Sequence, residues 1–278
     1  MNKRVLESIV IVVLISLFMV LAGTTKEAPL LTELLEGKYL SILGDSISTY
    51  IGYSNNESDN ETLKDNKVYY KGDNILTSVE ETWWKLIEKE TNLKVLVNNS
   101  YSGSKVFNSG KSKSEGWKDR SENLHNSSDV NPDIVSIYLG TNDARTDLEP
   151  GELDLIDLSN YIINNFDGTY SYETPKTFAQ AYAIMLHKII VKYENSDLFC
   201  FTVIPYETHK KVSEYNNVIR MVSAQFNCNI VDLENYKELT NALENDLFGV
   251  TVHPNERGMK LIAEAFKETL EKIYMEKN

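Results

Sequence analysis

The chain has 278 residues and a formal net charge of −13, with 42% hydrophobic and 25% charged residues. This balance is typical of a globular protein and excludes a fibrous or largely disordered chain. The acidic charge and the lack of a basic cluster argue against nucleic acid as a partner, because phosphate backbones attract positively charged surfaces.

Residues 1–23 have the layout of an export signal. Lys3 and Arg4 precede a short apolar run over residues 9–21. A positive start before a short apolar core is typical of a secretory signal peptide. The run is shorter than the about 20 apolar residues of a membrane span, but an N-terminal membrane anchor over residues 5–23 stays open. Under both interpretations we expect an extracellular or cell-surface protein.

A spacer over residues 24–37 is expected to lead into one domain, residues 38–278. The apolar run over residues 39–43 predicts a buried strand, and Gly44-Asp45-Ser46 follows it directly. Gly44 is expected to allow a sharp turn, since glycine tolerates backbone angles that other residues avoid. Ser46 would then lie at the carboxyl end of the strand, where ligands bind in open α/β sheets.

A long polar stretch covers residues 48–80 and is rich in Asn, Ser and Tyr. Loops of this length are often functional or disordered. Tyr50, Tyr53, Tyr69 and Tyr70 could offer ring faces to a sugar or another flat group. A solvated insertion that binds no ligand is an equally good interpretation.

The next elements place two hydrogen-bond donors after strands. Residues 82–90 are predicted to be helical, and a second strand over residues 94–97 leads to a polar loop containing Gly103. The N–H of Gly103 could donate to an oxyanion. A third strand over residues 134–139 precedes Asn142, whose side-chain amide could do the same.

The second half of the chain alternates helices with strands. An acidic insertion over residues 144–174 has no strong pattern. Alternating strands and helices predict an α/β fold with a parallel sheet covered on both faces. About five strands favour a three-layer α/β/α sandwich of the flavodoxin-like kind. The later elements are a helix over 175–194, strands over 198–204 and 229–233 with a helix over 210–226 between them, and a closing helix after Asn255.

The cysteines and most histidines do not form a recognisable site. Cys200 and Cys228 lie in or beside apolar runs. Export would allow a disulfide, but two buried free thiols on neighbouring strands are the favoured interpretation. His209 is interpreted as a loop residue, and no motif surrounds His125 or His187. No cluster with the spacing of a metal site stands out.

Four segments would share one edge of this sheet, because each follows a strand. They are Gly-Asp-Ser-Ile-Ser around Ser46, the loop of Gly103, Gly-Thr-Asn-Asp around Asn142 and His-Pro-Asn at His253. In order, spacing and strand placement, they resemble the conserved blocks of the SGNH hydrolases, the GDSL-type esterases and lipases. The resemblance extends over about residues 39–270.

The resemblance implies a role for each residue. Ser46 would be the nucleophile and would form an acyl-enzyme, and His253 would be the base. The backbone N–H groups of Ser46 and Gly103 and the side-chain amide of Asn142 would form the oxyanion hole. The resemblance implies no metal or cofactor.

One position departs from the family's pattern. An Asp usually lies three residues before the histidine, and here Val250 occupies that position. A backbone carbonyl near Val250, a shifted acid such as Asp246, or no acid at all could take its place. Our hypothesis is a Ser46–His253 dyad whose imidazole is oriented by a backbone carbonyl.

The sequence thus predicts a secreted or surface-anchored serine esterase that cleaves carboxylic esters, with O-acetyl groups on carbohydrate as one substrate class. The expected partner is a small-molecule or carbohydrate ester. The alternative is a catalytically weak surface protein that binds glycans or another partner, and Val250 is the feature that favours it. A dinucleotide-binding fold is disfavoured, because no Gly-x-Gly-x-x-Gly follows the first strand.

Overall fold

The computed structural model leaves several segments of the chain without a description. Two predicted features, the signal peptide or anchor over residues 1–23 and the candidate acid Asp246, lie outside the described residues, as does His209. For residues 249–250 only the backbone is described. The described residues are 29–54, 68–72, 75–109, 115–146, 148–152, 158–206, 211–241, 247–250 and 252–276.

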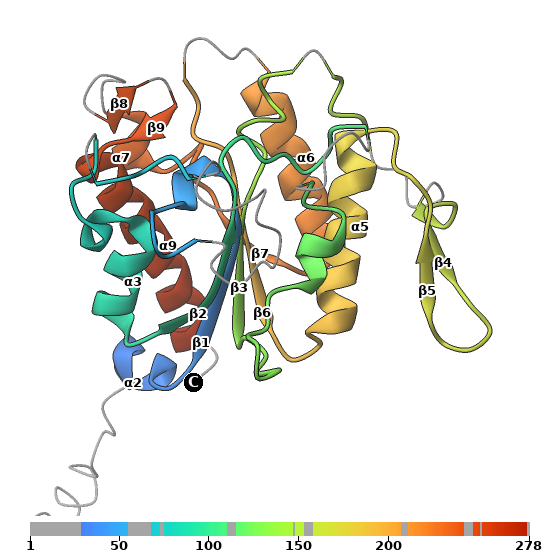
Figure 1. Ribbon diagram of the computed structural model, residues 1–278, viewed down its shortest axis with the longest axis horizontal. Coiled ribbons are helices and arrows are strands. Elements are labelled where there is room, and N and C mark those ends of the chain that lie inside the picture. The colour runs from blue at the N-terminus through green and yellow to red at the C-terminus, as the bar shows by residue number, and fades with distance from the viewer. Residues whose placement is uncertain are drawn as a thin grey trace, which may run out of the picture.

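Five parallel strands form the central sheet (Figure 1). They are β1 (Tyr39–Gly44), β2 (Lys94–Ser100), β3 (Ile134–Tyr138), β6 (Asp197–Phe201) and β7 (Asn229–Val231). Their order across the sheet is β2-β1-β3-β6-β7, and every neighbouring pair is parallel. All residues of β3 are buried, as expected for a sheet covered on both faces. The predicted parallel sheet of about five strands is confirmed.

Helices form a layer on each face of this sheet (Figure 1). One layer contains α2 (Leu31–Leu35), α3 (Trp83–Thr91) and α9 (Glu256–Glu276), and the other contains α5 (Phe178–Lys192) and α6 (Val212–Gln225). In the first layer, the ring centroid of Trp83 lies 5.4 Å from Phe201 and 6.0 Å from Phe266. The three layers confirm the α/β/α sandwich.

The two longest helices follow the hydrophobic periodicity of the sequence. Met259, Ile262 and Phe266 recur at helical spacing on α9, and all three are buried. Helix α5 begins after Thr177, because the hydroxyl of this residue accepts a hydrogen bond from the N–H of Gln180 at 3.3 Å and caps the first turn.

The strand order reverses between β1 and β3. The chain passes from β1 to β2 on one side and then crosses to β3 on the other. In sheets of this kind, ligands bind outside the carboxyl ends of the strands at such a reversal. Ser46 follows β1 and Asn142 follows β3, so the fold brings both residues to this point.

Shorter elements occur in the connecting segments. The antiparallel hairpin of β4 (Ile162–Asn164) and β5 (Tyr170–Tyr172) projects from the body of the fold (Figure 1). It lies in the acidic insertion that showed no strong pattern in the sequence. The others are η1 (Ser46–Ser48), η3 (Val79–Glu81), η4 (Asp119–Glu122), α7 (Lys237–Thr240) and the antiparallel pair β8 (Phe248–Val250) and β9 (His253–Pro254).

Both cysteines are free thiols in the structure. Cys200 is buried in β6, whereas Cys228 precedes β7 and is partly exposed. The favoured interpretation holds, except that Cys228 is not fully buried. Within the described ranges, no group of three or more His, Cys, Asp or Glu side chains could hold a metal ion. None of the helices in those ranges is long and apolar enough to cross a membrane.

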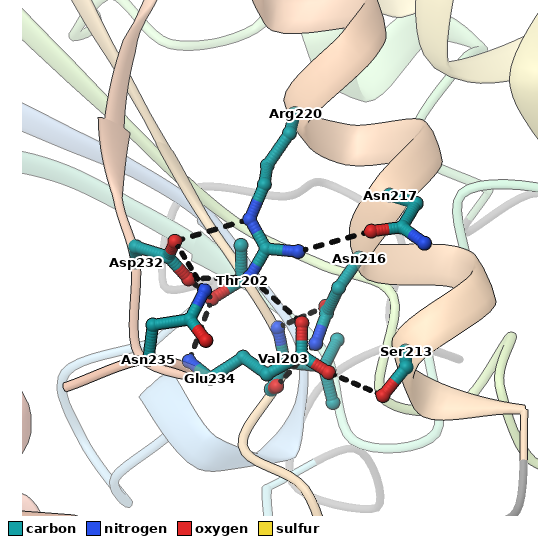
Figure 2. Close-up of polar contacts among 9 residues, drawn as sticks. All are labelled: Thr202, Val203, Ser213, Asn216, Asn217, Arg220, Asp232, Glu234 and Asn235. Carbon is teal, nitrogen blue, oxygen red and sulfur yellow. Dashed lines mark hydrogen bonds and ion pairs between the residues drawn. The ribbon is translucent and has the colours of Figure 1, made fainter. Parts of the chain in front are cut away.

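A polar network connects α6 to the ends of β6 and β7 (Figure 2). Arg220 donates to the two carboxylate oxygens of Asp232 at 2.6 and 3.1 Å and to Glu234 at 2.7 Å. Burial raises the pKa of Asp232, but hydrogen bonds from Arg220 and Asn235 outweigh burial, so the pKa lies below its usual value. Thr202 donates to Asp232 and accepts from the N–H of Glu234. The network therefore links α6 to the segments that follow β6 and β7 and stabilises their arrangement.

Candidate active site

The end of β1 positions Ser46 at the start of the helical turn η1. The carboxylate of Asp45 accepts a hydrogen bond from the N–H of Ile47 at 3.0 Å and caps this turn. Gly44 is required for space: an added Cβ would lie 2.6 Å from the Oγ of Ser100 and 2.8 Å from the Oγ of Ser48. The expectation that Gly44 supplies an unusual backbone angle was wrong, since its φ is not positive.

The structure brings Ser46 and His253 into hydrogen-bond contact. The Nε2 atom of His253 lies 2.9 Å from the Oγ of Ser46, and both residues are buried. With a neutral imidazole, the hydroxyl donates to Nε2. This distance is the one at which a histidine can take the proton from a serine nucleophile.

Aromatic rings enclose the imidazole of His253. The ring of Tyr69 is stacked on it, with centroids 3.3 Å apart and planes inclined by 8°. Tyr70 approaches with its edge at 6.2 Å, and its hydroxyl donates to the carbonyl oxygen of Pro254 at 2.9 Å. In the β8–β9 ladder, His253 pairs with Val250. The candidate acid Asp246 lies outside the described residues, so the dyad hypothesis stays a prediction.

The loop after β2 positions Gly103 beside the side chain of Asn142. Gly103 has a φ of +74°, a conformation that glycine adopts without strain, and the space around its missing side chain is open. The amide nitrogen of Asn142 donates to the carbonyl oxygen of Ser104 at 2.9 Å. An amide carries two N–H donors, so the second can serve a developing negative charge. This hydrogen bond therefore joins the loop of Gly103, which follows β2, to the loop of Asn142, which follows β3.

Asp143, next to Asn142, holds the part of the Gly103 loop that follows Ser104. Its two carboxylate oxygens accept hydrogen bonds from the N–H groups of Val106 at 3.0 Å and Phe107 at 2.9 Å. Burial raises the pKa of Asp143 to about 7, although these hydrogen bonds act in the opposite direction. Asp143 was assigned no role of its own from the sequence, and its position beside Asn142 was the available signal.

Arg120 is a supporting residue that sequence reasoning missed. Its buried guanidinium donates to the carbonyl oxygen of Gly44 at 2.8 Å, to the Oδ1 of Asn99 at 3.2 Å and to the Oγ of Ser104. It also lies over the ring of Tyr101, with 4.6 Å from the guanidinium carbon to the ring centroid. Burial lowers the pKa of Arg120 to about 10. One cation thus joins the ends of β1 and β2 to the Gly103 loop.

His125 and His187 do not contact Ser46 or His253 in the part of the chain that the structure describes, and each has a tyrosine partner. The Nδ1 of His125 lies 3.0 Å from the hydroxyl of Tyr193, and the Nδ1 of His187 lies 3.0 Å from that of Tyr172. Burial lowers the pKa of His187. Both contacts involve helix α5, because His187 lies in this helix and Tyr193 is its C-cap residue.

We expect Asp45→Asn to change the pH dependence of stability. Burial raises the pKa of Asp45 from 3.8 to about 6, against the opposing effects of the Ile47 N–H and Arg120. Because the folded state holds the proton more tightly than the unfolded chain, the free energy of unfolding falls as the pH rises from about 4 to about 6. An Asn does not titrate. The free energy of unfolding of the variant minus that of the parent, measured by urea unfolding, should therefore increase by up to about 3 kcal/mol as the pH rises from about 4 to about 6. A difference independent of pH would contradict this assignment.

The fold and this geometry define a hydrolase of the α/β/α sandwich class, with a serine and a histidine in contact at the carboxyl edge of the sheet. A family model described as GDSL-like Lipase/Acylhydrolase matches residues 38–270. The chain belongs to this family, and it is a hydrolase of ester bonds.

Solved structures agree with this assignment. A candidate GDSL-like lipase from Bacteroides ovatus is 25% identical with a TM-score of 0.61, and the match covers 84% of this chain and 98% of that one. One from Bacteroides uniformis is 23% identical with a TM-score of 0.60, covering 84% and 96%. One from Parabacteroides merdae is 19% identical with a TM-score of 0.54, also covering 84% and 96%. The last two support the fold alone. No curated protein matches the chain.

Proposed function

We propose that the protein is a secreted or surface-anchored serine esterase that cleaves carboxylic esters through an acyl-enzyme on Ser46. The observation that supports this proposal best is the 2.9 Å contact between the Oγ of Ser46 and the Nε2 of His253. Membership of the GDSL-like family supports ester hydrolysis in general. The export of the protein rests on the layout of residues 1–23.

The proposed reaction has two half-reactions. The Oγ of Ser46 attacks the ester carbonyl carbon while its proton passes to the Nε2 of His253. Negative charge on the former carbonyl oxygen is stabilised by the N–H groups of Ser46 and Gly103 and the amide of Asn142. The intermediate then releases the alcohol, which takes the proton from His253. Water, activated by the same imidazole, hydrolyses the acyl-enzyme and restores Ser46.

The group that orients His253 is proposed to be a backbone carbonyl. The β8–β9 ladder pairs Val250 with His253, so main-chain groups of this short turn lie beside the histidine. The pairing is in line with a Ser46–His253 dyad.

The proposed substrates include O-acetyl groups on carbohydrate. Tyr53 supports this class, because its ring is about half exposed and leans on the buried Trp84 at 6.1 Å between centroids. Trp84 donates to the carbonyl oxygen of Ser48, which belongs to the turn that begins with Ser46. A half-exposed tyrosine connected to this turn through Trp84 offers a surface on which a sugar ring can pack.

The proposal is tested by hydrolysis of p-nitrophenyl acetate by the parent and by Ser46→Ala. We expect kcat/KM to fall at least about 1,000-fold in the variant, because the acyl-enzyme can no longer form. Ser171→Ala, on the exposed hairpin strand β5, is the matched control and should leave turnover unchanged. Equal hydrolysis by parent and Ser46→Ala would contradict the proposal. Release of acetate from acetylated glycans would then test the substrate class.

A further inference from the structure

The short segment of residues 68–72 is attached to the turn that carries the proposed nucleophile. The hydroxyl of Thr49 donates to the carbonyl oxygen of Ser46 at 2.8 Å and accepts a hydrogen bond from the N–H of Tyr69 at 2.9 Å. The N–H of Ile51 donates to the carbonyl oxygen of Tyr70 at 3.0 Å. The backbone of the segment is therefore fixed relative to Ser46.

The same segment contacts the strand that carries the proposed base. Tyr70 is buried and its hydroxyl holds the carbonyl oxygen of Pro254, the residue after His253. Tyr69 is only partly buried, and its ring lies flat on the imidazole at 3.3 Å. Two adjacent tyrosines thus connect the two halves of the proposed dyad, one through the backbone and one through the reacting ring.

Resting on the proposed function, we propose that Tyr69 is a positioning residue for His253, whose ring keeps Nε2 directed at Ser46 and stabilises the imidazolium formed during acyl transfer. The stacked ring of Tyr69 hinders rotation of the imidazole about the Cβ–Cγ bond of His253. Such a rotation would push the edge of the imidazole into the tyrosine ring. The face of an aromatic ring also attracts a cation. Tyr69 forms no bond and exchanges no proton in the reaction.

The position of Val250 shows why such a residue is useful here. In a serine–histidine–aspartate triad, the carboxylate holds the imidazole in orientation and stabilises its protonated form. This chain has an apolar residue three positions before His253. The stacked ring supplies both effects from a different direction, whether or not a further group contacts Nδ1.

The test compares Tyr69→Leu with Tyr69→Phe in the full chain. Leucine keeps an apolar side chain over the imidazole but removes the aromatic face, so kcat for p-nitrophenyl acetate should fall about 3- to 30-fold with KM within about twofold. Phenylalanine keeps the face and should restore kcat to within about threefold of the parent. The rate of Ser46 sulfonylation by phenylmethylsulfonyl fluoride should fall in parallel with kcat, because that attack uses the same base.

Tyr170→Leu is the matched control, because Tyr170 packs edge-on against a second histidine, His187, at 4.5 Å and 73°. It should change neither kcat nor KM, and thermal melting should show all variants folded. Unchanged kcat in Tyr69→Leu would overturn the inference, and so would a Tyr69→Phe variant as slow as Tyr69→Leu. A parent that neither hydrolyses the ester nor reacts with the fluoride would overturn the proposed function and this inference together.

Discussion

Asn142→Ala should lower kcat about 100- to 1,000-fold while KM changes little. Removing one preorganised oxyanion donor costs about 2.7–4 kcal/mol of transition-state stabilisation. The effect falls on kcat because the donor acts on charge that exists only in the transition state. In the structure, the side chain of Asn142 is held in place by its 2.9 Å hydrogen bond to the carbonyl oxygen of Ser104, so the donor requires no reorganisation when charge develops.

Asn142→Ala removes both the hydrogen bond to Ser104, which affects stability, and the proposed oxyanion donor, which affects kcat. One hydrogen bond contributes about 1 kcal/mol to stability, which is a small change in melting temperature for a chain of this size. Asn165→Ala is the matched control, since the amide of Asn165 donates to Thr169 within the projecting hairpin. Steady-state kinetics and thermal melting of both variants decide the matter. A higher KM with unchanged kcat in Asn142→Ala would exclude the oxyanion role of Asn142.

Arg120→Met should be the most destabilising of the substitutions considered. The guanidinium donates to Gly44, Asn99 and Ser104, and the methionine would remove these buried hydrogen bonds. Breaking such a buried charged network costs about 3–5 kcal/mol. For a domain of this size, that corresponds to a decrease of about 10 °C in melting temperature.

Arg120→Lys tests the geometry as opposed to the charge. Lysine keeps the cation but cannot present the planar set of N–H donors, so it should recover only part of the lost stability. Arg145→Met, at an exposed arginine, is the matched control and should melt close to the parent. Differential scanning calorimetry of the three variants measures the effect. Equal melting of Arg120→Met and Arg145→Met would show that the buried cation does not support the fold.

The sheet and its helices could be predicted because they depend on local patterns. The apolar run over Ile134–Tyr138 marks a buried strand without knowledge of its partners. The meeting of Ser46 and His253 follows from topology, since the carboxyl ends of parallel strands share one edge. The fold class and the proximity of these two residues could therefore be predicted from the sequence, whereas the order of the strands across the sheet comes from the structure.

The contacts that support the site could not be predicted in this way. Arg120 reaches the carbonyl of Gly44 across 76 positions, and no motif surrounds it. Tyr69 is one of several tyrosines in a polar insertion, and only the packed structure places its ring on His253. Gly44 was identified correctly, but for the wrong reason, because the closeness of Ser100 is a property of the neighbouring strand.

The separation of the two proposed reacting groups along the chain has a consequence for biogenesis. Ser46 and His253 lie 207 positions apart, and the helix that follows His253 packs against α3 through the shared core of Trp83 and Phe266. Contacts between such distant positions form late in folding, because a long loop must close first. We therefore expect the proposed dyad to assemble late in folding, after the long loop between its two members has closed. On this expectation, recovery of ester hydrolysis during refolding should follow the recovery of helical structure, and not precede it.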